Sequence, residues 1–389
     1  MQRVPRSIVR EEGGPARVTS LELFFDLVFV FALTQVTALI ARDPTFASMG
    51  RGLLVLAILW WAWSGYAWLT STVDPELALT RVVMFAAMGA MLIVALATPR
   101  AFGDDGVVWG VAYLALRLLH AALFRLGARG DPALRHQVVS LVLSVIPGAG
   151  LIILAGAALE GTARDLLWVA AVLLDYGIVL SFGVEGWRVR AEHFAERFAL
   201  IVIIALGESI VAIGVGAQDL RLDALEIAAA LTALAVVCLL WWGYFDVSAL
   251  IAEHRFREAT GADQLRLARD AYALLHLPMV AGIALFAVGV KKTLGDPGDA
   301  LKDMPAVALC AGLALYAVAH VAFRLRSVGA LSVPWTLAAL GCLALLPIAM
   351  TAPSLVALAL LAVVWLALIA YETLRQAAFR HEVRAERVG

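Results

Sequence analysis

Long apolar stretches separated by short polar connections run along almost the whole chain. About twelve are long enough to cross a hydrocarbon core of about 30 Å, which takes roughly 20 helical residues. They lie near 20–41, 50–70, 80–98, 107–126, 138–158, 166–187, 194–217, 224–250, 270–291, 303–323, 330–351 and 353–374. The pattern predicts an all-α polytopic membrane protein with about twelve transmembrane helices.

The two halves of the chain share short motifs in the same order. The segment ELFFDLVFVFALTQ at 22–35 matches ERFALIVIIALGES at 196–209. Further along, ILWWAWSGY in the first half matches LLWWGYFDV in the second, and LLHAALFRL matches AVAHVAFRL. The last match places His120 opposite His320. These pairs predict an internal duplication.

The predicted repeats cover residues 20–187 and 194–374, with six helices in each. Because six is even, the second repeat enters the membrane from the same side as the first, so we expect parallel repeats. Residues 1–19 and 375–389 are left as terminal segments. Most of the 30 Lys and Arg residues lie in these segments and in the even-numbered loops between helices. Basic residues gather on the cytoplasmic side, so the pattern predicts that both termini are cytoplasmic.

The composition supports this class and excludes others. Hydrophobic residues make up 62% of the chain, charged residues 16%, and the mean hydropathy is +0.89, all far from a soluble globular domain. A net charge of -1 gives no reason to expect a nucleic-acid partner, whereas the lipid bilayer is an expected one. The three cysteines and the scattered histidines predict neither a disulfide framework nor a metal site, and no cofactor is expected. Homo-oligomerisation is left open.

An acidic pair stands inside the first predicted span. Glu22 and Asp26 are four residues apart, so both carboxylates lie on one helical face. An ionisable group near the bilayer centre costs at least about 2.5 to 3.5 kcal/mol on insertion scales, which makes each one a functional candidate. Two carboxylates this close favour a shared proton. The alternative is that Glu22 caps the helix and Asp26 pairs with a cytoplasmic arginine.

Deeper spans carry further charges. Arg117 needs an acidic partner in hydrocarbon, and Asp175, Glu208 and Asp26 are the candidates. An excess of acids over Arg117 would leave a carboxylate free to bind a proton or a cation. The alternative is a purely structural ion pair.

The matched motifs add polar positions to the candidate substrate or ion site. His120 and His320 could relay protons, or each could make a structural hydrogen bond. The other polar members are Gln35, Glu196, Ser209 and Asp246.

Two further patterns concern a cavity. The tryptophans at 60–68 and 241–242 predict either an aromatic cage or an interfacial belt, and tryptophan favours the membrane boundary. Pro147 and the glycines after it predict a break in the fifth helix, which is tolerated where protein or a water-filled cavity satisfies the backbone.

The strings TSLELFFDLVFVFALTQ and HFAERFALIVIIALGESIVAIG resemble the hallmark segments of the bacterial low temperature requirement protein A (LtrA) family. The similarity extends over nearly the whole chain. It implies a multi-spanning protein of the plasma membrane, but it supplies no substrate, reaction or catalytic residue.

The predicted function is therefore argued from the polar residues. A secondary transporter, with a proton-linked carboxylate site among helices 1, 7, 4 and 6, is the leading hypothesis. An ion channel lined by the polar faces of helices 1 and 7 is the alternative. A membrane-embedded enzyme or scaffold, which would need a nucleophile and a base converging at one membrane face, is the third; an enzyme is the less favoured class.

Overall fold

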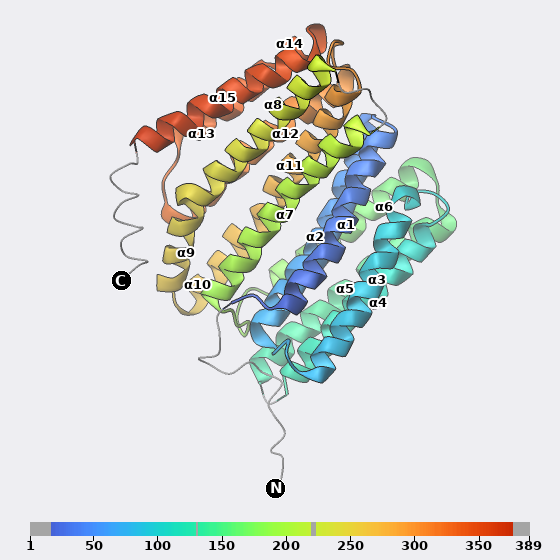
Figure 1. Ribbon diagram of the computed structural model, residues 1–389. Coiled ribbons are helices and arrows are strands. Elements are labelled where there is room, and N and C mark those ends of the chain that lie inside the picture. The colour runs from blue at the N-terminus through green and yellow to red at the C-terminus, as the bar shows by residue number, and fades with distance from the viewer. Residues whose placement is uncertain (1–16, 130, 219–222, 376–389) are drawn as a thin grey trace. The chain divides into compact units, whose positions relative to one another are not determined.

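The computed structural model describes residues 17–129, 131–218 and 223–375, and these residues are helical nearly throughout, with no β-strand among them (Figure 1). The all-α membrane class is confirmed, because 11 helical segments are long and apolar enough to cross a membrane. The remaining predicted span is α6 (Gly161–Ser181), which has the length to cross but carries three charged residues. The predicted terminal segments fall mainly on 1–16 and 376–389, outside the described residues.

The helices form two compact units. Unit 1 comprises the described residues of Met1–Ile201 together with Arg257–Ala273, and unit 2 comprises those of Val202–Phe256 and Leu274–Gly389. Compactness and sequence duplication are different properties, so the predicted repeats stay a prediction.

Unit 1 holds the first six long helices, the beginning of α7 and the short helices that precede α11. Its elements are α1 (Ser20–Arg42), α2 (Phe46–Thr72), α3 (Ala78–Ala97) with the 3-10 turn η1 (Thr98–Arg100), α4 (Gly106–Gly127), α5 (Pro132–Ala158), α6, α7 (Ala191–Ala217) as far as Ile201, α10 (Gly261–Leu267) and the π-helical η3 (Ala268–Leu274) as far as Ala273.

Unit 2 holds the rest of α7 and the helices after it. Its elements are α8 (Ala224–Gly243), the π-helical η2 (Tyr244–Ser248), α9 (Ala249–Glu258) as far as Phe256, α11 (His276–Gly295), α12 (Asp303–Val328), α13 (Val333–Ala344), α14 (Leu346–Thr351) and α15 (Ser354–Arg375). The polar connection after α8 is divided between α9 and α10, which prolong the neighbouring spans.

The start of α1 is fixed by a capping box. The Thr19 hydroxyl accepts the backbone N–H of Glu22, while the Glu22 carboxylate accepts the backbone N–H of Thr19 at 2.8 Å. Two of the N–H groups that a helix leaves unpaired at its start are thereby satisfied. The capping alternative for Glu22 is therefore correct, and its position at the helix start follows from local chemistry.

The predicted break in the fifth helix is wrong. α5 runs without interruption through Pro147, which is internal to the helix. A proline removes one backbone donor, and a packed membrane helix can continue past that loss. Gly148, which follows it, faces α6, since a Cβ there would lie 3.6 Å from the Cβ of Asp175, an ordinary van der Waals distance.

Close helix packing at glycines builds the core of each unit. In unit 1 a Cβ on Gly156 would lie 2.6 Å from the carbonyl carbon of Gly106, so α4 and α5 touch backbone to backbone. In unit 2 a Cβ on Gly289 of α11 would lie 2.7 Å from the Cα of Leu309 on α12. Small residues at such crossings let membrane helices approach closely.

Candidate functional site

Four side chains of α1 and α7 meet in the interior of unit 1. The α1 acid pair is Glu22 and Asp26, and the α7 basic pair is His193 and Arg197. Nε2 of His193 lies 2.8 Å from Oε1 of Glu22, and Nη2 of Arg197 donates to Oδ1 of Asp26 at 2.8 Å. All four residues are fully buried. We call this arrangement the α1–α7 charge network.

Side chains of α2 extend the network. The indole of Trp63 donates to Oδ1 of Asp26 at 2.8 Å, and the guanidinium of Arg197 lies over the Trp63 ring at 5.7 Å. The Ser71 hydroxyl lies 3.1 Å from Nδ1 of His193. Oδ2 of Asp26 and Nη1 of Arg197 make no hydrogen bond with the described residues, although Nη1 lies 3.7 Å from the Glu22 carboxylate.

His193 and Arg197 were missed from the sequence, and a signal for them was present. Like the acid pair, they are separated by four residues and share one helical face. The aligned position that drew attention was Glu196, which is exposed and accepts the backbone N–H of Val18 at 2.9 Å. The partner of Asp26 is an arginine, as the structural alternative required, and it stands on α7.

A second ion pair joins α4 to α6. Nη1 of Arg117, near the middle of α4, lies 3.1 Å from Oδ2 of Asp175, and Nη2 lies 3.2 Å from Oδ1. Tyr113 completes the group, because its hydroxyl donates to Asp175 at 3.0 Å and accepts from Arg117 at 3.1 Å. The predicted pairing of Arg117 with an acid is confirmed, with Asp175 as the partner.

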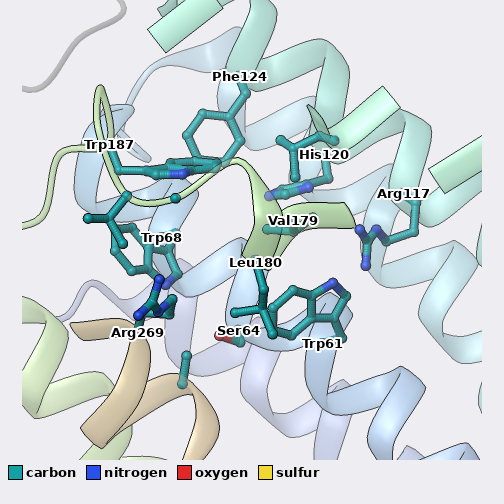
Figure 2. A pocket seen from close by; sticks show the side chains of 15 residues that line it. Trp61, Ser64, Trp68, Arg117, His120, Phe124, Val179, Leu180, Trp187 and Arg269 are labelled. Atoms are coloured by element: carbon teal, nitrogen blue, oxygen red, sulfur yellow. The ribbon is translucent and has the colours of Figure 1, made fainter. Parts of the chain in front are cut away.

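Beside this pair lies a cavity of about 60 Å³ within unit 1. A buried water needs roughly 10 to 15 Å³ on the same measure, so the cavity has room for several. Figure 2 shows His120 and Arg117 on one side of it, and Trp68, Trp187 and Arg269 on the other. It is lined by residues of α2, α4, α5, α6, the connection between α6 and α7, and η3.

Two side chains that line this cavity hold buried polar atoms without partners in the described part of the chain. Neither ring nitrogen of His120 makes a hydrogen bond of acceptable geometry with the described residues, and neither does Nε of Arg117. Both side chains are only 2% exposed. The His120 ring is pressed against α2, where a Cβ on Gly65 would lie 2.9 Å from Cε1. An unsatisfied buried polar group costs about 1 to 3 kcal/mol, so these atoms are suited to a water or a ligand in the cavity.

The connection between α6 and α7 forms one wall of the cavity, and two hydrogen bonds to residues at the start of α5 hold it in place. Arg188 donates to the Asp131 carboxylate at 2.7 Å, and Gln137 donates to the carbonyl of Glu185 at 2.6 Å. Asp131 also caps α5. The backbone N–H of Leu134, together with Arg188, lowers the pKa of the Asp131 carboxyl below its ordinary value.

Unit 2 carries its own polar cluster around the π-helical turn η2. Tyr244 bonds to Nε2 of His276 at 2.8 Å, and Ser248 bonds to Nε2 of His320 at 2.8 Å. The imidazole of His320 stacks on Trp335 with ring centroids 3.6 Å apart. π-Helical turns often mark functional sites. His320 therefore has the structural hydrogen bond that was one of its two interpretations.

The structure does not place all predicted site residues in one pocket. Gln35 is half-buried on α1, more than three turns beyond Glu22. Glu208 and Ser209 are buried on the part of α7 that belongs to unit 2, and Asp246 is half-buried in η2. Among the described residues, no group of three or more His, Cys, Asp or Glu side chains is placed to hold a metal ion.

The tryptophans serve several purposes. Trp61 and Trp68 line the cavity, so an aromatic wall exists there. Trp60 is fully buried and donates to the carbonyl of Ala273 at 2.6 Å. Trp241 and Trp242 on α8 are 47% and 44% exposed, as expected of residues that face lipid.

These spans and buried charges define a multi-pass integral membrane protein whose environment is a lipid bilayer. The family profile described as bacterial low temperature requirement A protein (LtrA) matches residues 17–370. A protein of Rhizobium meliloti (strain 1021) named "Uncharacterized protein RA0937" is 32% identical over 304 residues, covering 74% of this chain and 72% of the relative. The chain belongs to the LtrA family.

Proposed function

We propose that the protein is a secondary transporter and that the cavity in unit 1 is its solute-binding chamber. The observation that carries the proposal is that His120 and Arg117, which hold buried polar atoms without partners among the residues that the structure describes, both line a cavity large enough for several waters. Arg117 lies near the middle of α4, the depth at which transporters bind their substrates. A buried polar group without a partner is costly, which favours a site that a solute occupies.

The α1–α7 charge network is proposed to link this chamber to protons. Its histidine contacts a carboxylate and a hydroxyl in the protein interior, and imidazole is the side chain that gains and loses a proton near neutral pH. A change in the charge of His193 would alter its attraction to Glu22 and so bias the packing of α7 on α1. This supplies a physical route for proton coupling.

The contact between α1 and α7 argues against the channel alternative. That alternative needs the polar faces of these helices to line an open pore. Within unit 1 the two faces are packed on one another, with Glu22, Asp26, His193 and Arg197 all fully buried.

One observation favours a membrane-embedded enzyme as the second candidate. Ser71, His193 and Glu22 stand in the order hydroxyl, imidazole, carboxylate, an order that nucleophilic enzymes use. However, Ser71 is buried and is not part of the cavity wall, so the cavity does not bring a substrate to its hydroxyl. In the transporter, Ser71 instead helps to orient His193.

We also propose that the chain consists of two parallel six-helix repeats, 20–187 and 194–374, in the plasma membrane with both termini cytoplasmic. The packing of the two matched histidines supports the duplication. His120 of α4 packs against Gly65 of α2, and His320 of α12 packs against Ser248, which follows α8. In each repeat the histidine of the fourth helix meets the second helix.

The test is a solute-uptake screen in proteoliposomes, with and without an imposed pH gradient. Val179→Phe, which adds a ring to the cavity wall, should abolish uptake, whereas Arg81→Gln, which breaks an exposed ion pair with Glu76, should leave it largely intact. Uptake that survives Val179→Phe would contradict the chamber assignment. Hydrolytic activity that requires Ser71 would replace the transporter with the enzyme.

A further inference from the structure

The charges around the unit 1 cavity have one sign. Its 15 lining residues include Arg117 and Arg269, and none of them is Asp or Glu. Asp175 neutralises Arg117 but lines a separate, smaller cavity of about 10 Å³. Arg269 is held through its Nε by Asp270 at 2.7 Å, and Asp270 is also not part of the wall. A ligand in the cavity therefore meets arginine side chains from two sides, while the carboxylates that pair with them are not part of the wall (Figure 2).

The unused hydrogen-bonding capacity also favours an acceptor. Nε of Arg117 can only donate, and no described residue accepts from it. His120 makes no hydrogen bond of acceptable geometry with the described residues, although its ring lies against the Gly65 backbone, and a neutral imidazole has one donor nitrogen. A planar oxyanion could accept from both residues at once. An ammonium ion would find no carboxylate in the wall, and a sugar would find too few polar partners, since Ser64 is the only hydroxyl residue in the wall.

The remaining wall fixes the size and character of the ligand. Trp61, Trp68, Trp187 and Phe124 surround the polar side chains with aromatic surface. The rim of an aromatic ring is electropositive, so it suits an anion, while its face suits a short hydrocarbon body. A cavity of about 60 Å³ admits only a few non-hydrogen atoms beyond the oxyanion group.

From these features we infer that the cavity binds a small monoanion, of the class of short-chain monocarboxylates. Arg117 and His120 hold the oxyanion, Arg269 contributes positive potential, and the tryptophans enclose the body. This assignment names the substrate class of the proposed transporter and rests on that proposal for its physiological meaning. Binding itself can be measured without transport.

The tryptophans in the wall provide the assay. The detergent-solubilised full chain is titrated with sodium acetate in chloride-free buffer, and tryptophan fluorescence and melting temperature are followed. We expect a saturable fluorescence change and a rise in melting temperature, because a ligand that binds only the folded state stabilises it. Sodium gluconate, a carboxylate too large for the cavity, should produce neither.

Two variants test the site. Arg117→Gln combined with Asp175→Asn removes the cation without stranding its partner, and should weaken acetate binding about tenfold or more. The matched control neutralises Arg324 and Glu372, a pair in unit 2 at 3.2 Å, by the same substitutions and should leave binding unchanged. Val179→Phe, which leaves the ion pair intact, should abolish binding even if the first variant does not fold.

The inference is overturned if acetate gives no saturable response, if gluconate acts equally, or if Val179→Phe binds as well as the native protein. Acetate binding without flux in proteoliposomes would support the anion site and remove the transporter proposal. Flux of another solute without acetate binding would do the reverse.

Discussion

The α1–α7 charge network predicts a large loss of stability when one charge is removed. In Arg197→Gln the carboxylates of Glu22 and Asp26 both lose a cation that lies 3.7 Å and 2.8 Å away. Both acids are fully buried, so water cannot replace it. Removing one partner of a buried pair costs about 3 to 5 kcal/mol. For a unit of this size, a loss of 1 kcal/mol lowers the melting temperature by roughly 2 to 4 °C, so we expect a drop of about 6 to 20 °C.

A double-mutant cycle isolates the pair. Asp26→Asn keeps the size of the side chain and an oxygen that can accept from Trp63, and the double variant with Arg197→Gln contains no stranded charge in this pair. We expect the double variant to be more stable than the sum of the single losses predicts, by about 0.5 to 3 kcal/mol.

The assay is thermal unfolding in detergent of the native chain, both single variants and the double variant. The control is Arg81→Gln, which breaks an exposed ion pair with Glu76 and should cost no more than about 1 kcal/mol. Additive losses, or a loss in Arg197→Gln no greater than in the control, would refute this account of the network.

The Asp26→Asn variant also distinguishes a role of Asp26 in stability from a role in proton coupling. If Asp26 carries a coupling proton, Asp26→Asn should yield a folded protein whose uptake no longer responds to pH, because an amide cannot ionise. Glu208→Gln is the companion test for the acid on the unit 2 part of α7. Unaltered pH dependence in both variants would exclude proton coupling through these carboxylates.

Three further predictions concern other parts of the chain. Asp131→Ala should lower the free energy of unfolding by about 1 kcal/mol at neutral pH, because α5 loses its cap. The folded state lowers the pKa of this carboxyl, so the difference between the variant and the native protein should shrink as the pH falls through that pKa. Thermal unfolding at pH ~7 and pH ~3 measures this change. Gly289→Ala should cost about 1 to 3 kcal/mol because its Cβ would strike Leu309, while Gly177→Ala, whose Cβ meets nothing within 4 Å, should not destabilise. Cysteines placed at either terminus, in a background without native cysteines, should be protected from an impermeant reagent in intact cells, and labelling from outside would overturn the proposed orientation.

The membrane class was predictable because a spanning helix leaves a strong and simple signal. Each one needs about 20 apolar residues, and no other kind of domain repeats that requirement so often. The pairing of Arg117 with an acid was predictable for a similar reason, since an isolated guanidinium in hydrocarbon is too costly to persist. Which of three acids it pairs with was not, because that choice depends on how α4 and α6 pack.

The cavity could not be predicted from the sequence, because it too depends on how the helices pack. Its wall combines residues of α2, α4, α5, α6 and η3, and no periodicity within one helix indicates that Trp61, Trp187 and Arg269 share a space. The expected pointer to it, a broken helix at Pro147, was wrong because α5 is continuous there. The cavity owes its polar character to side chains left without partners, and that is a property of the assembled unit.

The α1–α7 charge network lies between these cases, since its partners could have been deduced. Two buried acids four residues apart require two cations with the same spacing on a facing helix. His193 with Arg197, and His320 with Arg324, both have that spacing, and each pair overlaps the edge of a predicted span. The direction of the helices discriminates between the two pairs. Glu22 and Asp26 lie near the start of α1, so a parallel helix can pair with them only if its cations lie near its own start. Only the pair on α7 does so, while Arg324, near the end of α12, is engaged by Glu372. Spacing, depth and direction together are therefore sufficient to select the partner that alignment of Glu22 with a second glutamate concealed.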